Sequence, residues 1–439
     1  MATVYIYSGA TGAANGTSWT DAYTTISAAL TGGLTASDTG LLASDHSETG
    51  TTALTLNFPT TPGLRLVSVN RTSGLAEVGA VIARGAGSVA ITINNSVYGY
   101  GIDFQGATNN SASAYIQHHN STSNGCHQSW ESCTFNTRTA SASANYQTGL
   151  SSSLSDDLFF EYINCTWRWN ATGQTWTHHC GRVEIYGMAL AGTVSPTTLF
   201  TANGTGGMVE VSASDLTGLS WSTLVSGSLN PFTYEFTGCK LNSGITALSS
   251  SASTNGGTQV WLSDCASGDT HLDYGYYNAL GSVTRSTATY LTAGVAGVSW
   301  LISTTAAVTR ANPFKTPWID RYYDLTSAVT PYFEVLRNNG TAAAYTDAEV
   351  FGEFEAKVTS ASTAATFYSD RASPESSGSA QAAGVGTGSW TITGSFSPYS
   401  FKVDTGASLT PAETGYLRGR LCVGVASVGA LHLAPSVLT

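Results

Sequence analysis

The stretch FFEYINCTWRWN, residues 159–170, decides the fold, because variants of it recur further along the chain. The later variants are RVEIYGMAL, MVEVSASDL and TYEFTGCKL. Each variant places a glutamate among apolar residues and a small or sulfur-bearing residue four positions later. Recurrence of one phrase at a regular interval indicates a repeat fold, in which equivalent residues of neighbouring repeats stack on one another.

The interval between these phrases indicates which repeat fold. When the phrases are aligned on the position four residues after the glutamate, the series is Cys133, Cys165, Met188, Ser214, Cys239 and Cys265, although Ser129 and Trp261 replace the glutamate in the first and last phrases. The position two further on holds Phe135, Trp167, Leu190, Leu216, Leu241 and Ser267. Subtracting successive residue numbers of the first series gives intervals of 32, 23, 26, 25 and 26. Such a period suits a parallel β-helix, whose coils of three short strands stack ~4.8 Å apart. The alternative is an antiparallel β-sandwich with coincidental spacing; we favour the β-helix.

The composition supports a folded β protein and disfavours several functional classes. Only 10% of the 439 residues are charged, 42% are hydrophobic, and 10 Trp, 21 Tyr and 15 Phe are present. The net charge of −11, without any basic cluster, argues against nucleic-acid binding, which depends on Lys and Arg. No apolar run reaches the length of about 18 residues that a membrane span needs, and no secretory signal is visible.

The seven cysteines predict neither a disulfide framework nor a metal or cofactor site. They are odd in number, widely spaced and without a CxxC pair, so most are expected to be buried free thiols. Cys126 with Cys133, and Cys165 with Cys180, are close enough in sequence for a local disulfide. Free thiols favour a protein made in a reducing cytoplasm.

Patterning divides the chain into three segments. Residues 1–45 are predicted to hold a strand and a short amphipathic helix, N-capped by Ser18 or Thr20, that covers the open first coil. The apolar face of that helix consists of Trp19, Ala22, Tyr23, Ile26, Ala29 and Leu30. Residues 46–310 are predicted to form the parallel β-helix, and residues 311–439, from the Pro-containing stretch NPFKTPWIDRYYDL onward, an antiparallel β-sandwich. The predicted fold class is therefore all-β.

Two stretches carry a resemblance to proteins of tailed bacteriophages. YIYSGATGAANGTSWTDAYTTISAAL resembles the start of right-handed β-helix proteins such as phage tailspikes and bacterial polysaccharide lyases. TPWIDRYYDLTSAVTPYFEVLRNNGTAAAYTDAEVFGEFEAKV, followed by GYLRGRLCVGVAS, resembles the C-terminal region of virion structural proteins in tailed phages, over roughly residues 315–439. The resemblance implies a tailspike-like virion component, assembled in the host bacterial cytoplasm, that associates as a homotrimer.

The glutamates of the repeated phrase are the main candidate site residues: Glu161, Glu184, Glu210 and Glu235. Stacking would place neighbouring carboxylates near the ~5–5.5 Å of retaining glycosidases and next neighbours near the ~6.5–9.5 Å of inverting ones. The same row also fits solvent-facing scaffold residues, flanked by inward Phe160 and Tyr162 and neutralised by Arg168, Arg182 or Lys240. Contact with another subunit, ligand binding and catalysis are therefore three open alternatives, and we prefer the first.

Aromatic and histidine side chains supply secondary candidates. Trp169 and Trp176 are predicted to lie at the surface, where they could stack on a sugar ring. Trp167 belongs to the inward series and is expected in the core. The adjacent histidines at 118–119 and 178–179 point to opposite faces of a strand, so neither pair chelates a metal alone. We therefore assign no metal and no cofactor.

The expected function is a virion structural protein without enzymatic activity. The β-helix begins within about the first 60 residues, which leaves no room for a preceding particle-anchoring module. This favours a capsid-surface decoration protein, a cement or head fibre that binds the major capsid protein. The alternative is a tail-associated receptor-binding spike with polysaccharide-binding or depolymerase activity and a host surface glycan as partner. A secreted lyase or adhesin is disfavoured by the missing signal sequence.

Overall fold

The computed structural model divides by its internal contacts into a first unit, Met1–Ser253 with Gly257–Asp273, and a second unit that holds the remainder. In the first unit the structure describes residues 2–267 except 62, 88, 110–114, 121–124, 140, 142–144, 150–157, 228–231, 246 and 252–257. Beyond residue 267 it describes 270–278, 281–286, 299–305, 308–309, 312–317, 319–324, 332–337, 343–345, 350–358, 365–369, 390–392, 399–404, 414–426 and 431–433.

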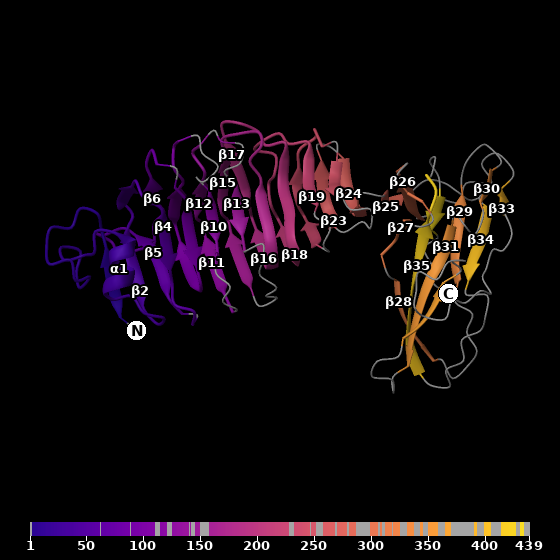
Figure 1. Ribbon diagram of the computed structural model, residues 1–439, viewed down its shortest axis with the longest axis horizontal. Coiled ribbons are helices and arrows are strands. Elements are labelled where there is room, and N and C mark those ends of the chain that lie inside the picture. The colour runs from indigo at the N-terminus through magenta and orange to yellow at the C-terminus, as the bar shows by residue number, and fades with distance from the viewer. Residues whose placement is uncertain are drawn as a thin grey trace. The chain divides into compact units, whose positions relative to one another are not determined.

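Three parallel sheets make up the first unit, and their strands follow one another in chain order (Figure 1). The first sheet contains β1 (Thr3–Ile6), β2 (Thr39–Ala43), β5 (Arg65–Val69), β8 (Val97–Tyr100), β11 (His127–Glu131), β14 (Phe159–Ile163), the C-terminal parts of β16 (Trp176–Tyr186) and β18 (Thr198–Ser212), β20 (Phe232–Thr237) and β23 (Thr258–Ser267). Every pairing along this path is parallel, as the β-helix prediction requires.

The other two sheets complete each coil. The second sheet contains β3 (Ser47–Gly50), β6 (Ala80–Arg84), β9 (Ile102–Gln105), β12 (Thr134–Asn136), β15 (Thr166–Trp169), β17 (Ala189–Gly192) and, through a bridge at Asp215, β21 (Lys240–Leu241). The third sheet contains β4 (Leu54–Asn57), β7 (Ile91–Asn94), β10 (Ile116–His118), β13 (Tyr146–Thr148), the N-terminal parts of β16 and β18, β19 (Thr223–Gly227) and β22 (Ala247–Ser251). One strand from each sheet per coil is a β-helix-like arrangement.

The register confirms the repeat deduced from the sequence. Phe135 pairs with Phe104 on one side and with Trp167 on the other, and the ring centroids lie 5.7 Å and 5.4 Å apart. The sulfur-bearing and small residues of the other inward series are also buried: Cys133, Cys165, Met188, Ser214, Cys239 and Cys265. Equivalent side chains therefore stack inside the unit from coil to coil, and this stacking forms its core.

A left-handed residue turns the chain from the first sheet to the second in successive coils. These residues, with φ between 47° and 70°, are Gly101, Ser132, Asn164, Gly187, Ala213, Gly238 and Asp264. The first six each donate a backbone N–H to a carbonyl oxygen of the next coil, at 2.7–3.0 Å. The buried thiol that follows the corner adds a weaker bond, as when Cys165 Sγ donates to the Trp130 carbonyl at 3.3 Å. The same hydrogen-bonded corner therefore recurs in the six coils from Gly101 to Gly238.

The N-terminal helix is shorter than predicted and begins later. Helix α1 spans Ile26–Gly32, and its N-cap is Thr25, whose hydroxyl accepts from the Ala28 N–H at 3.1 Å. The predicted caps Ser18 and Thr20 are wrong, because the preceding chain pairs with β1 instead: the Tyr23 N–H donates to the Tyr5 carbonyl at 3.0 Å. The helix packs against β1 and β4 of the first coil, in agreement with the capping prediction.

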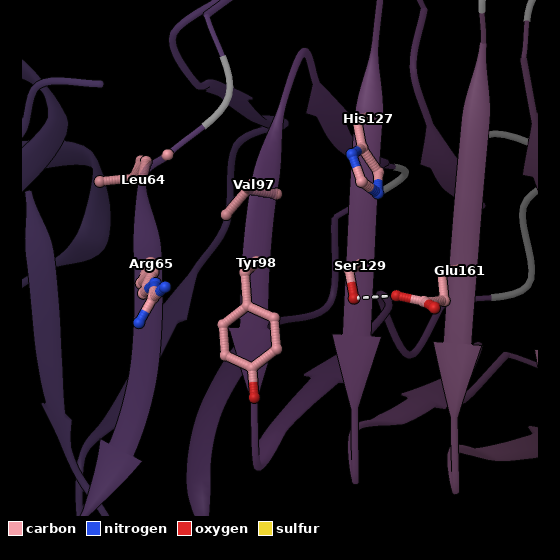
Figure 2. Close-up of a pocket in the computed structure, with 8 residues that line it drawn as sticks. Leu64, Arg65, Val97, Tyr98, His127, Ser129 and Glu161 are labelled. Carbon is pink, nitrogen blue, oxygen red and sulfur yellow. Dashed lines mark hydrogen bonds between the residues drawn. The ribbon is translucent and has the colours of Figure 1, made fainter. Parts of the chain in front are cut away.

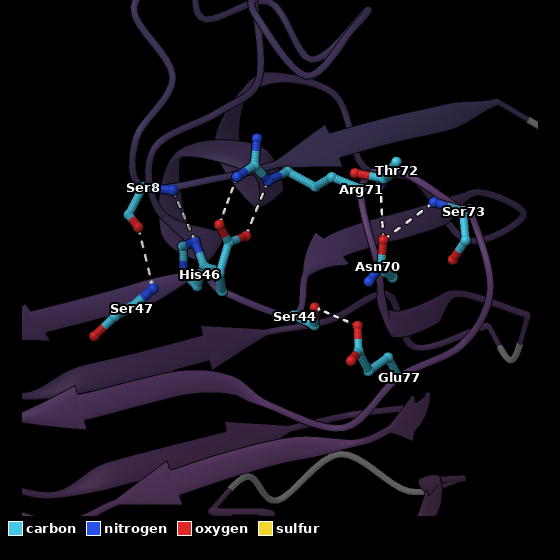
Figure 3. Close-up of polar contacts among 10 residues, drawn as sticks. Ser8, Ser44, His46, Ser47, Asn70, Arg71, Thr72, Ser73 and Glu77 are labelled. Atoms are coloured by element: carbon cyan, nitrogen blue, oxygen red, sulfur yellow. Dashed lines mark hydrogen bonds and ion pairs between the residues drawn. The ribbon is translucent and has the colours of Figure 1, made fainter.

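A buried ion pair joins the helix to the coil beneath it. The Glu48 carboxylate accepts from the Ile26 N–H at 2.8 Å, at the start of α1, and lies 3.4 Å from the Arg84 guanidinium. A carboxylate at a helix N-terminus is favoured by the helix dipole and by the unpaired N–H groups there. Nearby, Arg71 makes an exposed two-bond pair with Asp45 (Figure 3). The Arg71 guanidinium also lies over the ring of Tyr7.

The second unit consists of antiparallel strands. One set pairs in the order β24 (Thr270–Asn278), β25 (Gly281–Ser286), β26 (Ser299–Thr304), β36 (Leu431–Leu433), β29 (Tyr332–Arg337) and β34 (Tyr399–Asp404). Another groups β35 (Thr414–Val423) with β27 (Phe314–Lys315), β28 (Ile319–Asp324) and β31 (Val350–Val358), and β31 pairs with β32 (Ala365–Ser369); β30 (Ala343–Tyr345) pairs with β33 (Trp390–Ile392). The predicted domain boundary at residue 310 lies later than the division at Asp273, because antiparallel pairing already begins at β24. The predicted sandwich stays a prediction.

All seven cysteines are buried thiols. Within the described part of the chain, no helix is long and apolar enough to cross a membrane.

Candidate functional site

The outward face of the first sheet carries a continuous row of polar side chains, one from each strand. The register pairs Glu161 with Glu184, Glu184 with Glu210, and Glu210 with Glu235. We call these four residues the glutamate row. The neighbouring strands continue it with Ser129, Tyr98 and Arg65 on one side and with Trp261 on the other. All four glutamates therefore occupy equivalent positions on neighbouring strands, as the repeated phrases predicted.

Local partners compensate part of the charge in the glutamate row. The Arg182 Nη2 atom lies 2.8 Å from Glu184 Oε1 and 2.9 Å from Glu210 Oε1. Because both oxygens contact one nitrogen, they lie no more than the sum of these distances, 5.7 Å, apart. Glu161 instead accepts from the Ser129 hydroxyl at 2.6 Å. Of the three counter-charges named from the sequence, Arg182 is the one that contacts the row; Lys240 pairs with Asp215.

Glu235 is electrostatically different from the other members of the row. Partial burial raises the pKa of its carboxyl, the neighbouring Glu210 charge raises it further, and Arg182 opposes the increase. A raised pKa favours the protonated carboxylic acid. The row therefore combines two carboxylates that contact Arg182 with one whose pKa is raised, and a carboxyl of raised pKa can support acid–base chemistry.

Two depressions lie on this face and share Glu161. One has a volume of about 480 Å³ and is lined by Gly63, Leu64, Arg65, Val97, Tyr98, His127, Ser129 and Glu161. Figure 2 shows Arg65, Tyr98, Ser129 and Glu161 side by side on four neighbouring strands. The other has a volume of about 320 Å³ and is lined by Glu161, Tyr162, Ile163, Glu184, Ile185, Tyr186, Glu210 and Ser212. Together they form a polar groove across the strands.

Aromatic side chains flank the groove, and the sequence analysis missed them. Tyr186 is 54% exposed and lines the second depression. Phe159 is partly exposed, and the His127 ring packs edge-on against it at 4.8 Å. Tyr98 lines the first depression, where its hydroxyl donates to Glu131 at 2.7 Å. Strand alternation from the glutamate row would have identified these outward positions.

The aromatic candidates named from the sequence are wrong. Trp169 and Trp176 are 0% and 1% exposed, so neither can stack on a ligand at the surface. The Trp169 ring packs against Tyr146, with 5.2 Å between centroids. Trp176 stacks on Trp167 at 4.4 Å and donates its indole N–H to the Thr148 hydroxyl at 2.7 Å. Both belong to the core.

The paired histidines are also part of the interior. All four are buried, and burial lowers the pKa of His118 to about 4 and that of His178 to about 3. The Nδ1 atom of His118 lies 3.0 Å from Gln128 Oε1, and that of His178 lies 2.9 Å from the Tyr234 hydroxyl. A search of the described residues finds no group of three or more His, Cys, Asp or Glu side chains placed to hold a metal ion.

Comparison with known proteins gives a likeness to solved structures that is weak. No protein-family model matches the chain, and no curated protein does. Among solved structures, the chain is similar to the enzymatically active domain of tailspike protein 4 from bacteriophage CBA120. The TM-score is 0.25 with 8% sequence identity, and the alignment covers 90% of this chain and 63% of that one. The chain thus spans less than two thirds of the tailspike domain.

This comparison corrects one expectation and fails to support another. The expectation of a protein without enzymatic activity is not upheld: the matched structure is described as an enzymatically active domain, which is a statement about that protein. The capsid decoration role receives no support from the comparison. Any enzymatic chemistry of this chain has to come from its own side chains, of which the glutamate row is the leading candidate.

Proposed function

We propose that this chain is a receptor-binding spike protein of a tailed bacteriophage, associated with the tail, whose groove on the first sheet binds a host-surface glycan. The observation that carries the proposal is the alignment of four glutamates, Arg182 and Tyr186 along one face of a parallel-sheet stack. Carboxylates accept hydrogen bonds from sugar hydroxyls, while aromatic rings provide apolar surface for the sugar ring. The phage origin rests on the resemblance of the N-terminal and C-terminal stretches.

A glycan-binding measurement tests this function. The wild-type chain is applied to an array of bacterial surface polysaccharides, together with Tyr186→Ala in the groove and Arg168→Ala, an exposed residue of the second sheet. We expect Tyr186→Ala to weaken binding about tenfold, the loss of one aromatic contact, and Arg168→Ala to bind like wild type. Equal behaviour of the two variants, or no binding by the wild type, would contradict the proposal.

Cleavage of the bound glycan is a second candidate, favoured by the environment of Glu235. Glu235 would act as the general acid, because its pKa is raised, and Glu210, one strand away, would act as the second carboxylate. Neighbouring strands lie ~4.8 Å apart, close to the carboxylate separation of retaining glycosidases. Arg182 would orient the Glu210 carboxylate through their 2.9 Å contact.

Product analysis separates cleavage from binding alone. Incubation with a glycan that the chain binds should release new reducing ends, and Glu235→Gln should abolish the release while binding persists. Arg168→Ala, on the second sheet outside the groove, serves as the control and should retain cleavage. If wild type binds a glycan but releases no reducing ends, the face only binds.

Partners and location belong to the same proposal. The chain is expected to associate as a homotrimer, to bind other virion proteins and to be part of the virion. Light scattering of wild type and of Glu184→Gln/Glu210→Gln tests whether the glutamate row also contacts another subunit; a shift to monomer in the double variant would indicate such a contact.

Immunogold labelling of intact particles tests the location of the protein in the virion. Label over heads rather than tails would reject the proposal of a tail-associated spike.

A further inference from the structure

Arg65 is an exposed cation in line with the glutamate row. The register runs from Arg65 through Tyr98 and Ser129 to Glu161. Arg65 forms no ion pair within 4 Å of any acidic residue that the structure describes, whereas Arg71 pairs with Asp45 at 2.5 Å. An exposed guanidinium without a carboxylate partner, in a chain of net charge −11, is available to an external anion.

The depression beside Arg65 is large enough for part of an oligosaccharide. Its volume is about 480 Å³, and its polar lining includes Arg65, Tyr98, His127, Ser129 and Glu161. Arg65 lies at one end and Glu161 at the other, and His127 lies on the strand next to Glu161 (Figure 2). Three strand steps separate Arg65 from Glu161, or ~14 Å at the usual strand spacing. The groove therefore has a cationic end and an anionic end.

We propose that this depression is a subsite for an anionic sugar residue, which pairs with the Arg65 guanidinium. The inference rests on the proposed glycan-binding function and adds the class of ligand. Guanidinium binds carboxylate and phosphate through two parallel hydrogen bonds, which fits a single anionic group at Arg65. The neutral hydroxyls of the next sugars would donate to Glu161 and to the rest of the row.

The same charge distribution orients the glycan. An anionic group placed over the glutamate row would face like charges, which are unfavourable even where solvent screens them. At Arg65 the group is three strands away from Glu161 and meets a positive charge. The anionic residue is therefore expected at the Arg65 end, with neutral residues towards Glu235.

The test compares arginine variants on defined glycans. The wild-type chain, Arg65→Ala, Arg65→Lys and Arg168→Ala are applied to uronate-bearing, phosphodiester-linked and neutral bacterial polysaccharides, at low and high salt. We expect wild type to prefer one of the two anionic sets, and Arg65→Ala to weaken that binding about tenfold or more. Arg65→Lys should lose less, Arg168→Ala should match wild type, and salt should weaken the wild-type interaction.

Each outcome has a defined meaning. Preference for the uronate set assigns the anion as a carboxylate, and preference for the phosphodiester set assigns it as a phosphate. Neutral glycans bound as tightly as anionic ones, or Arg65→Ala binding like Arg168→Ala, would overturn this inference and leave glycan binding intact. A wild-type chain that binds no glycan would overturn the proposed function itself. Because Arg65 is exposed, its substitution leaves the core unchanged, and equal melting temperatures of the variants verify this.

Discussion

At the scale of single residues, Glu235 makes the stability of the first unit depend on pH. Its pKa is raised by partial burial and by Glu210, so the folded chain keeps this proton at pH values where the unfolded chain has released it. The free energy of unfolding therefore decreases as the pH rises from the usual pKa of a glutamic acid side chain through the raised pKa of Glu235 in the folded chain.

We therefore expect Glu235→Gln to gain stability relative to wild type as the pH rises through that window. The glutamine cannot ionise, so the variant avoids the cost that wild type acquires when Glu235 loses its proton. Melting temperatures of both proteins between pH 4 and pH 8 measure the effect, with roughly neutral pH as the upper plateau. Parallel curves for the two proteins would show that Glu235 titrates normally.

The two tryptophans show why residue-level predictions were only partly correct. Trp169 lies two positions after the inward Trp167 on β15, so the two-residue periodicity of a strand already placed it inside. That error was avoidable. Trp176 begins the next strand, after a turn. The inward–outward alternation of β15 does not continue through that turn, so it could not predict which way the Trp176 side chain points. Its burial depends on contacts with Trp167 and Phe200 that only the folded chain reveals.

At the scale of elements, the left-handed corner between the first and second sheets can be tested at Ser132. Its φ is 53°, where a β-branched residue is strained. Ser132→Val should lower the free energy of unfolding by about 1–2 kcal/mol, and Ser132→Gly should change it by less than about 0.5 kcal/mol. Urea unfolding measures both variants. A valine variant as stable as the glycine variant would mean that the corner is not strained.

The buried ion pair between Glu48 and Arg84 should contribute far more to the free energy of unfolding than the exposed pair between Asp45 and Arg71. Glu48→Ala leaves Arg84 buried without its carboxylate and removes the acceptor of the Ile26 N–H, so we expect a loss of about 3–5 kcal/mol. Asp45→Ala, the matched control, breaks the solvated pair with Arg71 and should cost less than about 1 kcal/mol. Chemical denaturation measures both variants, and similar losses would show that the burial of Glu48 is unimportant.

The stacked strand positions could be predicted from the sequence, whereas the start of the helix could not. The stacked series at Cys133 and Phe135 was predictable, because each coil repeats the same inward positions and the register is set by burial. The start of α1 was not, because residues 18–23 have a helical apolar pattern while Tyr23 bonds to the backbone of β1. Long-range pairing overrode a local preference there.

At the scale of the whole molecule, the two units should unfold separately. Each has its own set of contacts, parallel in the first unit and antiparallel in the second. Calorimetry of the full chain should therefore show two transitions, and Glu48→Ala should lower the temperature of one of them only. A single transition that shifts as a whole in the variant would mean that the units unfold as one.

The repeated corner has a consequence for how such a chain changes its length. Gly187 and Ala213 occupy equivalent left-handed corners, and the 26 residues from Gly187 to Ser212 make up one coil. Deletion of those residues joins Tyr186 to Ala213 at the same kind of corner and brings Glu184 next to Glu235. An insertion or deletion of one whole coil is therefore expected to preserve the corners on either side, and it would lengthen or shorten the groove by one strand.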